Sequence, residues 1–280
     1  MWKFFISACW FTILVLTTPL FSQEEIDSPS SSVAEYEPPH RFGLWVGLFL
    51  PTFTSQAQVT SQTLGLGPSV NLEKSFQLPT DETLFRLEAF FRFNKHHSIY
   101  AGYYKSSREG TSEVTTEIQI GDLIIPVESQ AYTKNDISLL KFGYRFSIVN
   151  TEDFESGFGL GFSILFYKLF IEHKSNIREN TEDVDETLPI PVFNFYTVYN
   201  IWNRLNLSVY FDIFGVNLGD YDGSLADFSL GLTYRIFDNF AAGIDYNVYK
   251  LDVHVEKSNG FNGVIDYLHK GIAIYLYYGL

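Results

Sequence analysis

The stretch Ala226-Asp-Phe-Ser-Leu-Gly-Leu-Thr-Tyr-Arg-Ile236 alternates between apolar residues and polar or small ones. A period of two residues is typical of a β-strand with two unlike faces. Leu205–Ile213 and Phe158–Phe166 repeat the pattern, and alternation dominates from Arg41 to Leu280. This part of the chain has no convincing amphipathic helix. The sequence therefore predicts an all-β fold.

Alternation alone fits two architectures. A soluble sandwich or lipocalin-like barrel turns its apolar face inward, whereas a membrane barrel turns that face to lipid and keeps a polar lumen. The apolar faces here are almost entirely Leu, Ile, Val and Phe, with Tyr at several strand ends. Small and charged residues share the opposite face, where a soluble core needs bulk. The closing stretch alternates through Ile272, Ile274, Leu276, Tyr278 and Leu280. We therefore expect a transmembrane antiparallel up-and-down β-barrel.

The first residues predict export. Trp2-Lys3 gives a positive start, Phe4–Leu16 is apolar, and Leu20-Phe21-Ser22 fits a cleavage site. The apolar stretch of 13 residues is shorter than the roughly 20 that a spanning helix needs. We expect a signal peptide over residues 1–22, cleaved near Ser22, a flexible acidic segment over 23–40, and a barrel domain over 41–280.

Composition excludes several classes of protein. Hydrophobic residues make up 46% of the 280, aromatics 18% and charged residues 19%, which excludes a disordered chain. The net charge of −14 argues against a nucleic-acid partner. Cys9, within the predicted signal, is the single cysteine. Disulfides, thiolate catalysis and Cys-ligated zinc are therefore not expected in the mature chain.

Several motifs resemble a family of uncharacterised Gram-negative outer-membrane β-barrel proteins. The motifs are Phe85-Arg86-Leu87-Glu88, Phe91-Arg92-Phe93-Asn94 with His97-Ser98, Asp220-Tyr221-Asp222-Gly223-Ser224-Leu225, Leu232-Thr233-Tyr234-Arg235 and the closing strand. The closing strand of such proteins usually ends in Phe, and this chain departs mildly with Leu280. The resemblance implies a bacterial outer-membrane location, contact with membrane lipid and lipopolysaccharide, and insertion by the barrel-assembly machinery through the closing strand. It implies no known activity.

Turn signals set the expected number of strands. Tight turns are predicted at Asn94–His97, Asn150–Glu155, Trp202–Arg204 and Phe237–Asn239. Longer loops are predicted at Ala57–Asp81, Glu109–Ala131, His173–Thr187, Leu218–Gly223 and Glu256–Asn262. Four turns, five loops and both chain ends on one side give ten strands, some projecting beyond the membrane. Twelve strands result if Leu66–Phe76 and Glu117–Val127 each pair as an extra outside strand.

The polar faces collect charges that we expect to point into the lumen. They are Arg86, Glu88, Arg92, Lys141, Arg145, Asp212, Asp227, Arg235 and Asp245. An Arg or Lys on the lipid side at mid-depth costs about 2–4 kcal/mol. One interpretation is a paired network that fills a narrow barrel, and the other is a path for ions or solutes.

Other candidate sites have simpler explanations. Asp220 and Asp222 resemble the start of a calcium loop and are weak metal candidates, because Gly231 stands where such a loop carries Glu. Gly157-Phe158-Gly159-Leu160-Gly161 lies within a strand, where its glycines make room for large neighbours.

The remaining polar residues with ligand or catalytic chemistry are acids and histidines. The acids of the His173–Thr187 loop are solvated, or they contact lipopolysaccharide through divalent cations; they are Glu179, Glu182, Asp183, Asp185 and Glu186. His96 and His97 are expected to diverge, and His269 to be hydrogen-bonded within the lumen.

No catalytic pair and no cofactor site is recognised. The expected function is a structural or surface-interaction protein of the outer membrane with a largely filled lumen. A small passive channel is the alternative, and a surface hydrolase or lipid-modifying enzyme is the third.

Overall fold

The computed structural model describes residues 40–61, 65–66, 69–115, 117–120, 123–174, 179–218, 221–256 and 262–280. The expected signal peptide and residues 23–39 of the acidic segment lie outside the described residues, so those boundaries stay predictions. Ten strands form one closed antiparallel barrel, which confirms the expected fold class. The helical part of the described chain includes nothing long and apolar enough to cross a membrane.

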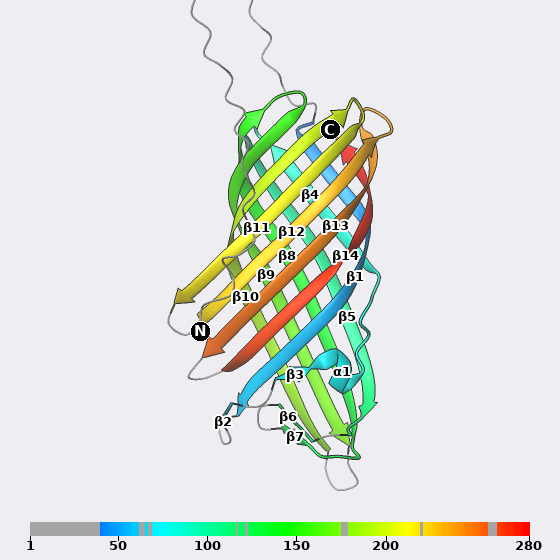
Figure 1. Ribbon diagram of the computed structural model, residues 1–280, viewed down its shortest axis with the longest axis vertical. Coiled ribbons are helices and arrows are strands. Elements are labelled where there is room, and N and C mark those ends of the chain that lie inside the picture. The colour runs from blue at the N-terminus through cyan, green and yellow to red at the C-terminus, as the bar shows by residue number, and fades with distance from the viewer. Residues whose placement is uncertain are drawn as a thin grey trace, which may run out of the picture. The chain divides into compact units, whose positions relative to one another are not determined.

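Each wall strand pairs with its neighbours along the chain, and the last pairs with the first (Figure 1). The wall strands are β1 (Phe42–Ser61), β4 (Leu84–Arg92), β5 (His97–Glu113), β8 (Gln130–Asn150), β9 (Phe154–Lys174), β10 (Glu179–Trp202), β11 (Leu205–Leu218), β12 (Tyr221–Arg235), β13 (Phe240–Glu256) and β14 (Asn262–Gly279). The closing register runs from Gly43 opposite Gly279 to Val59 opposite Gly263. The closing stretch is thus one long strand, as predicted.

The remaining elements do not join the wall, so the twelve-strand alternative is wrong. β2 (Gly65–Leu66) and β3 (Val70–Asn71) pair with the end of β1. β6 (Ile118–Ile120) and β7 (Leu123–Ile125) pair only with each other. The segment predicted as a strand over 66–76 instead contains the helix α1 (Leu72–Phe76).

The four tight turns lie at the predicted places and at one end of the barrel. They join β4 to β5, β8 to β9, β10 to β11 and β12 to β13. The C-terminus lies at this short-turn end (Figure 1), where Asn239 Nδ2 donates to Gly279 O at 2.7 Å. We call the opposite end the long-loop end.

Two predicted loops are wrong. Most of His173–Thr187 is strand, because β9 and β10 pair from Lys174 opposite Glu179 onward. β11 likewise extends to Leu218, and β12 begins at Tyr221. Every wall strand except β4 exceeds the roughly 10 residues that cross a bilayer: β9 has 21 and β10 has 24.

The outward face of the wall changes character along the strands. Towards the short-turn end it is apolar, and we call this part the apolar band; Leu48, Leu160, Phe193 and Ile274 are 53–58% exposed there. Towards the long-loop end the outward residues are polar and charged, among them Lys105, Glu109, Lys168 and Asp185. Strands therefore project beyond the apolar band, as predicted.

The inward face changes in the opposite sense. Towards the long-loop end the inward side chains form one apolar core. Members of this core from β8 and β9 are Ile137, Leu139, Leu165, Leu169 and Ile171, each at most 1% exposed. The lumen of the projecting half is thus filled mainly by apolar side chains, with a few buried polar ones such as Arg108, Glu73 and Asn135 among them.

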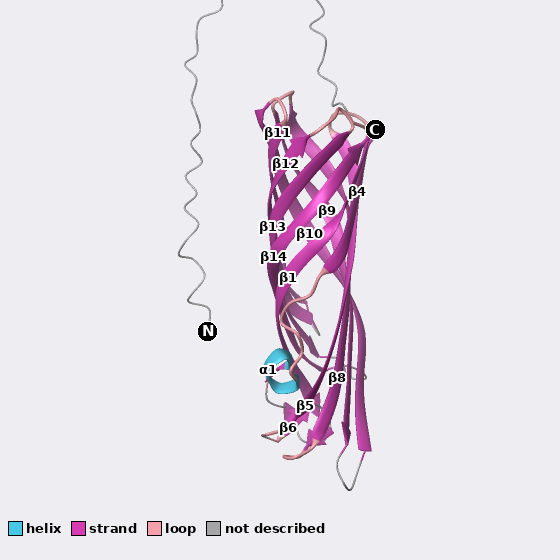
Figure 2. Ribbon diagram, turned by 90° about the vertical axis from the view of Figure 1, so that its right-hand side faces the viewer, coloured by secondary structure: helices cyan, strands magenta, loops and turns pink. Residues whose placement is uncertain are grey.

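Helix α1 belongs to this filled half and compensates for a short strand. β4 pairs with β1 only up to Leu84 opposite Phe49, so β1 and β5 continue without β4 between them. Figure 2 shows α1 in the projecting half of the barrel, and its Leu72 and Phe76 are fully buried in the core. A Cβ at Gly110 of β5 would lie 2.5 Å from Phe76 O, so glycine permits this close packing.

Candidate functional site

The short-turn half of the lumen is hollow. A cavity of about 510 Å³ lies there, within the size range of small-molecule sites. All nine charged residues that the sequence placed in the lumen line this cavity. They therefore surround open space and do not fill it, whereas apolar side chains fill the other half of the lumen.

Two cations hold two carboxylates each. The Arg86 guanidinium donates to Glu88 Oε1 at 2.8 Å and to Asp245 Oδ2 at 3.2 Å. Lys141 Nζ lies 3.2 Å from Asp212 Oδ2 and also contacts the Asp227 carboxylate. These six residues come from five strands, so their ion pairs bridge the lumen. Such pairing satisfies charges in a narrow space.

Arg92 forms the third ion-paired group, near the short turns. Its two Nη atoms lie 3.0 and 2.9 Å from the two oxygens of Glu155, a bidentate geometry. Glu155 also accepts from Ser147 Oγ at 2.7 Å and Tyr196 OH at 3.1 Å. Sequence reasoning missed Glu155 because it assigned that residue to a tight turn.

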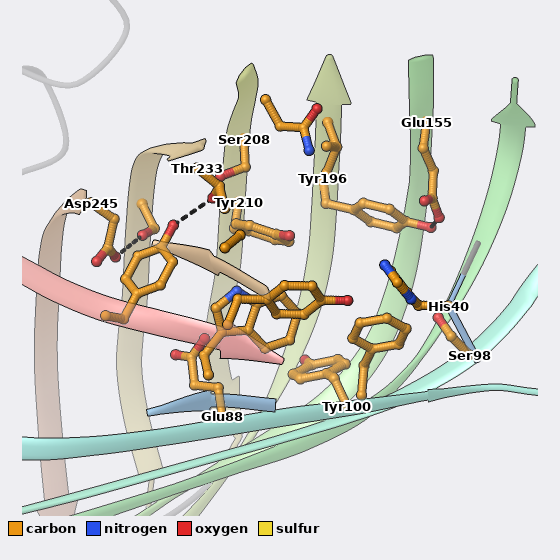
Figure 3. A pocket seen from close by; sticks show the side chains of 18 of the residues that line it. His40, Glu88, Ser98, Tyr100, Glu155, Tyr196, Ser208, Tyr210, Thr233 and Asp245 are labelled. Atoms are coloured by element: carbon orange, nitrogen blue, oxygen red, sulfur yellow. Dashed lines mark hydrogen bonds between the residues drawn. The ribbon is translucent and has the colours of Figure 1, made fainter. Parts of the chain in front are cut away.

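Arg145 differs from these cations. Its Nε donates to the neutral Asn194 Oδ1 at 2.8 Å. Its guanidinium carbon lies 3.9 Å from the centroid of the Tyr100 ring, 4.8 Å from Tyr210 and 5.2 Å from Tyr196. Figure 3 shows these tyrosines reaching the cavity from different strands. Strand alternation places these tyrosines at inward positions, so the sequence pattern could have predicted that they face the lumen.

The ninth residue, Arg235, lies at the short-turn end. Its guanidinium donates to Asn203 O of the β10–β11 turn. In the described chain no carboxylate lies within ion-pair distance of it. Arg235 therefore lines the mouth of the cavity and stays apart from the deeper ion pairs.

The boundary between the cavity and the apolar core is a buried polar layer. His269 is fully buried, with Nε2 3.1 Å from Asn247 Oδ1, and its ring stacks on Tyr249 at 5.0 Å. Asn247 Nδ2 in turn donates to Asp227 Oδ1 at 2.7 Å. The hydrogen bond predicted for His269 is therefore present. The hydroxyl that contacts this imidazole is that of Tyr104, 3.3 Å from Nε2.

The glycine run of β9 shapes the cavity wall. A Cβ at Gly161 would lie 2.8 Å from the Tyr100 hydroxyl, and one at Gly159 would lie 3.2 Å from Arg145 Cγ. The interpretation that these glycines make room for large neighbours is confirmed at both positions.

The other candidate sites are dispersed. Asp220 lies outside the described residues, and Asp222 is exposed on β12. Across the residues described, no three His, Cys, Asp or Glu side chains come together as a metal site. Asp185 pairs with Lys168 at 2.6 Å on the outward face. His96 and His97 contact different partners, Ser147 O and the Tyr144 hydroxyl, although both rings lie near Phe146, with centroids 5.9 and 5.2 Å away.

Comparison with known proteins identifies the fold and no family. No protein-family model matches the chain, and no curated protein matches it. Among solved structures it is similar to the outer membrane protease OmpT from Escherichia coli, with 10% identity and a TM-score of 0.59. That match covers 89% of this chain and all of the protease.

Two further matches are less similar. The attachment invasion locus protein Ail of Yersinia pestis has 12% identity and a TM-score of 0.31, over 84% of this chain and 99% of that one. The toluene transporter TodX of Pseudomonas putida has 7% identity and a TM-score of 0.32, over 85% and 90%. At these identities the likeness concerns the fold alone: the chain has the fold of outer-membrane β-barrel proteins.

Proposed function

We propose that the protein is a non-conducting outer-membrane barrel with a structural or surface-interaction role. The apolar band lies in the bilayer, the short-turn end faces the periplasm, and the projecting half stands outside the cell. The outward face supports this placement, because it is apolar over one part of the wall and charged over the other.

The apolar core of the projecting half is the observation that carries the proposal. Phe49, Phe53, Leu72, Phe76 and Tyr267 are each at most 2% exposed and belong to one buried cluster. Ions need water or polar groups along their path, and most side chains that fill this half are apolar. Its buried charges, Arg108 and Glu73, are paired with each other at 2.7 Å. The cavity on the short-turn side is therefore a blind pocket, and the alternative of a passive channel is less well supported.

The outer wall of the projecting half is the surface that we assign to interactions. It carries both signs of charge, as in the pairs Lys168–Asp185 at 2.6 Å and Lys134–Glu109 at 2.9 Å. Contact with lipopolysaccharide, through these cations or through divalent ions on the acids, belongs to the proposal. So does insertion by the barrel-assembly machinery through β14.

Planar-bilayer recording tests the proposal. The purified barrel is inserted alone, and a general porin serves as the control for insertion and for detection of openings. We expect no unitary openings from this protein at any voltage at which the bilayer is stable. Stable openings of defined size, abolished by a bulky reagent attached in the lumen, would establish the channel alternative instead.

A further inference from the structure

Arg145 is a cation inside the lumen without a carboxylate partner. Arg86, Arg92 and Lys141 each lie within 3.2 Å of a carboxylate oxygen. Within the described chain, Arg145 has no ion pair, and its one hydrogen bond uses Nε. Its two Nη groups are therefore left with donors that bind no described protein atom.

The surroundings of Arg145 fit a ligand better than they fit a structural cation. Three tyrosine rings within 5.2 Å favour the positive charge but leave the edge of the guanidinium fork unbonded. The Tyr100 hydroxyl is also buried and has no hydrogen-bond partner among the described residues. A planar guanidinium edge recognises carboxylates through two parallel hydrogen bonds.

The rest of the cavity wall indicates what the carboxylate would be attached to. Trp45 packs against Phe90 and Tyr277 with ring centroids 5.4 and 4.9 Å apart, and all three line the cavity. Flat apolar groups pack well on such rings. Glu152, Asp153 and Asp238 also line the cavity and would repel ligands with several negative charges.

We propose that the lumen cavity binds a small organic acid with a single carboxylate and a flat apolar body. The carboxylate lies on the guanidinium edge of Arg145, and the apolar body lies against the aromatic wall that contains Trp45. Since the apolar core closes the far side, the ligand enters and leaves at the short-turn end. This goes beyond the proposed function, because a barrel that only supports surface contacts has no need of such a pocket.

Benzoate is the probe for calorimetric titration of the full barrel in detergent. We expect saturable binding to the wild type, and affinity reduced at least about tenfold in Arg145→Lys, which keeps the charge but loses the fork. Arg204→Lys is the matched control, because it makes the same exchange at an exposed arginine of the β10–β11 turn that does not line the cavity. Its affinity should stay within about twofold of the wild type.

Two competing ligands and a folding control complete the experiment. Benzylamine has the same ring with the opposite charge, and inorganic phosphate is an anion without an apolar body; both should bind more weakly than benzoate. β-Sheet circular dichroism must show that Arg145→Lys is folded, and if it is not, Asn194→Ala replaces it with the same expected loss. Absence of saturable benzoate binding, equal binding of benzylamine or phosphate, or an unchanged affinity in a folded variant overturns the proposal.

Discussion

The two halves of the barrel use the same strands in opposite ways. In the short-turn half, Leu160 faces outward at 57% exposure and Lys141 faces a cavity. In the long-loop half, Leu165 on the same strand as Leu160 is fully buried inside, and Lys168 faces outward. One half is built like a membrane barrel, and the other like a soluble barrel with an apolar core. Period-two alternation therefore does not show whether the apolar face of a strand points into the lumen or out of the barrel. In this barrel the apolar face points outward in one half and inward in the other.

The comparison predicts that the single substitution with the largest loss of unfolding free energy lies in the filled half. Arg108 and Glu73 form a 2.7 Å ion pair with side chains 1% and 5% exposed, and Arg108 Nη2 donates to Ser55 Oγ. This pair fixes α1 to β1 and β5. Arg108→Met leaves the Glu73 carboxylate buried and unpaired, so the free energy of unfolding should fall by about 3–5 kcal/mol. Denaturant unfolding of the barrel in lipid vesicles measures it.

The matched control is an exposed pair at the same height of the barrel. Lys168→Met breaks the contact with Asp185, whose side chains are 59% and 58% exposed. Its expected effect is below about 1 kcal/mol. Pairing Arg108→Met with Glu73→Gln should recover part of the loss, because no buried charge then remains. Equal effects of Arg108→Met and Lys168→Met would contradict the burial of the Arg108–Glu73 pair within the core of this half.

The Arg108–Glu73 pair also marks the limit of prediction from the sequence. Local alternation predicted the ten strands, the tight turns and the nine charges around the lumen, since each depends on neighbours along the chain. Glu73 lies 35 residues from Arg108 in a segment that reads as a loop, and α1 is held there by tertiary contacts. The strand ends within His173–Thr187 were missed because acids on a projecting hairpin resemble a solvated loop.

The ion pairs of the cavity could not be predicted either, because they also join residues that are far apart in the sequence. Alternation placed Arg145 and Asp212 on the inward face, but it does not show which inward residues of different strands meet across the lumen. Arg145 bonds to Asn194, while Asp212 lies 3.2 Å from Lys141. Strand tilt and stagger decide such contacts, and these depend on closure of the whole barrel.

A second prediction compares the outward face in the two halves. Leu48 and Thr54 point outward from β1, Leu48 from the apolar band and Thr54 from the projecting part. Leu48→Arg places a charge in lipid and should lower the free energy of unfolding by about 2–4 kcal/mol. Thr54→Arg should change it by about 0–1 kcal/mol. Refolding into vesicles, followed by denaturant titration, compares the two variants. Similar losses of unfolding free energy would mean that the apolar band does not end between Leu48 and Thr54.

The smallest expected effect is a pH dependence that belongs to the projecting outer wall. Partial burial, and after it the nearby Asp252 carboxylate, raise the pKa of Asp266. Because the folded protein then holds this proton more tightly than the unfolded chain, its contribution to stability is present at acid pH and is lost as pH rises through the raised pKa. A hydrogen bond from Lys134 lowers the pKa of Glu109, so its contribution has the opposite sign: present at higher pH and lost on acidification.

Single variants separate these opposite contributions. Asp266→Asn should make the melting temperature rise more steeply with pH between about 3 and 6, because a destabilising ionisation is removed, while Glu109→Gln should make that rise shallower. Thermal melts followed by circular dichroism across this range measure both slopes. The effect of Glu109→Gln should shrink at high salt, since Glu109 lies in water, whereas that of Asp266→Asn should shrink less, since burial is the main cause of the raised pKa of Asp266. Slopes that change in the same direction for both variants would contradict the opposite contributions of Asp266 and Glu109 to stability.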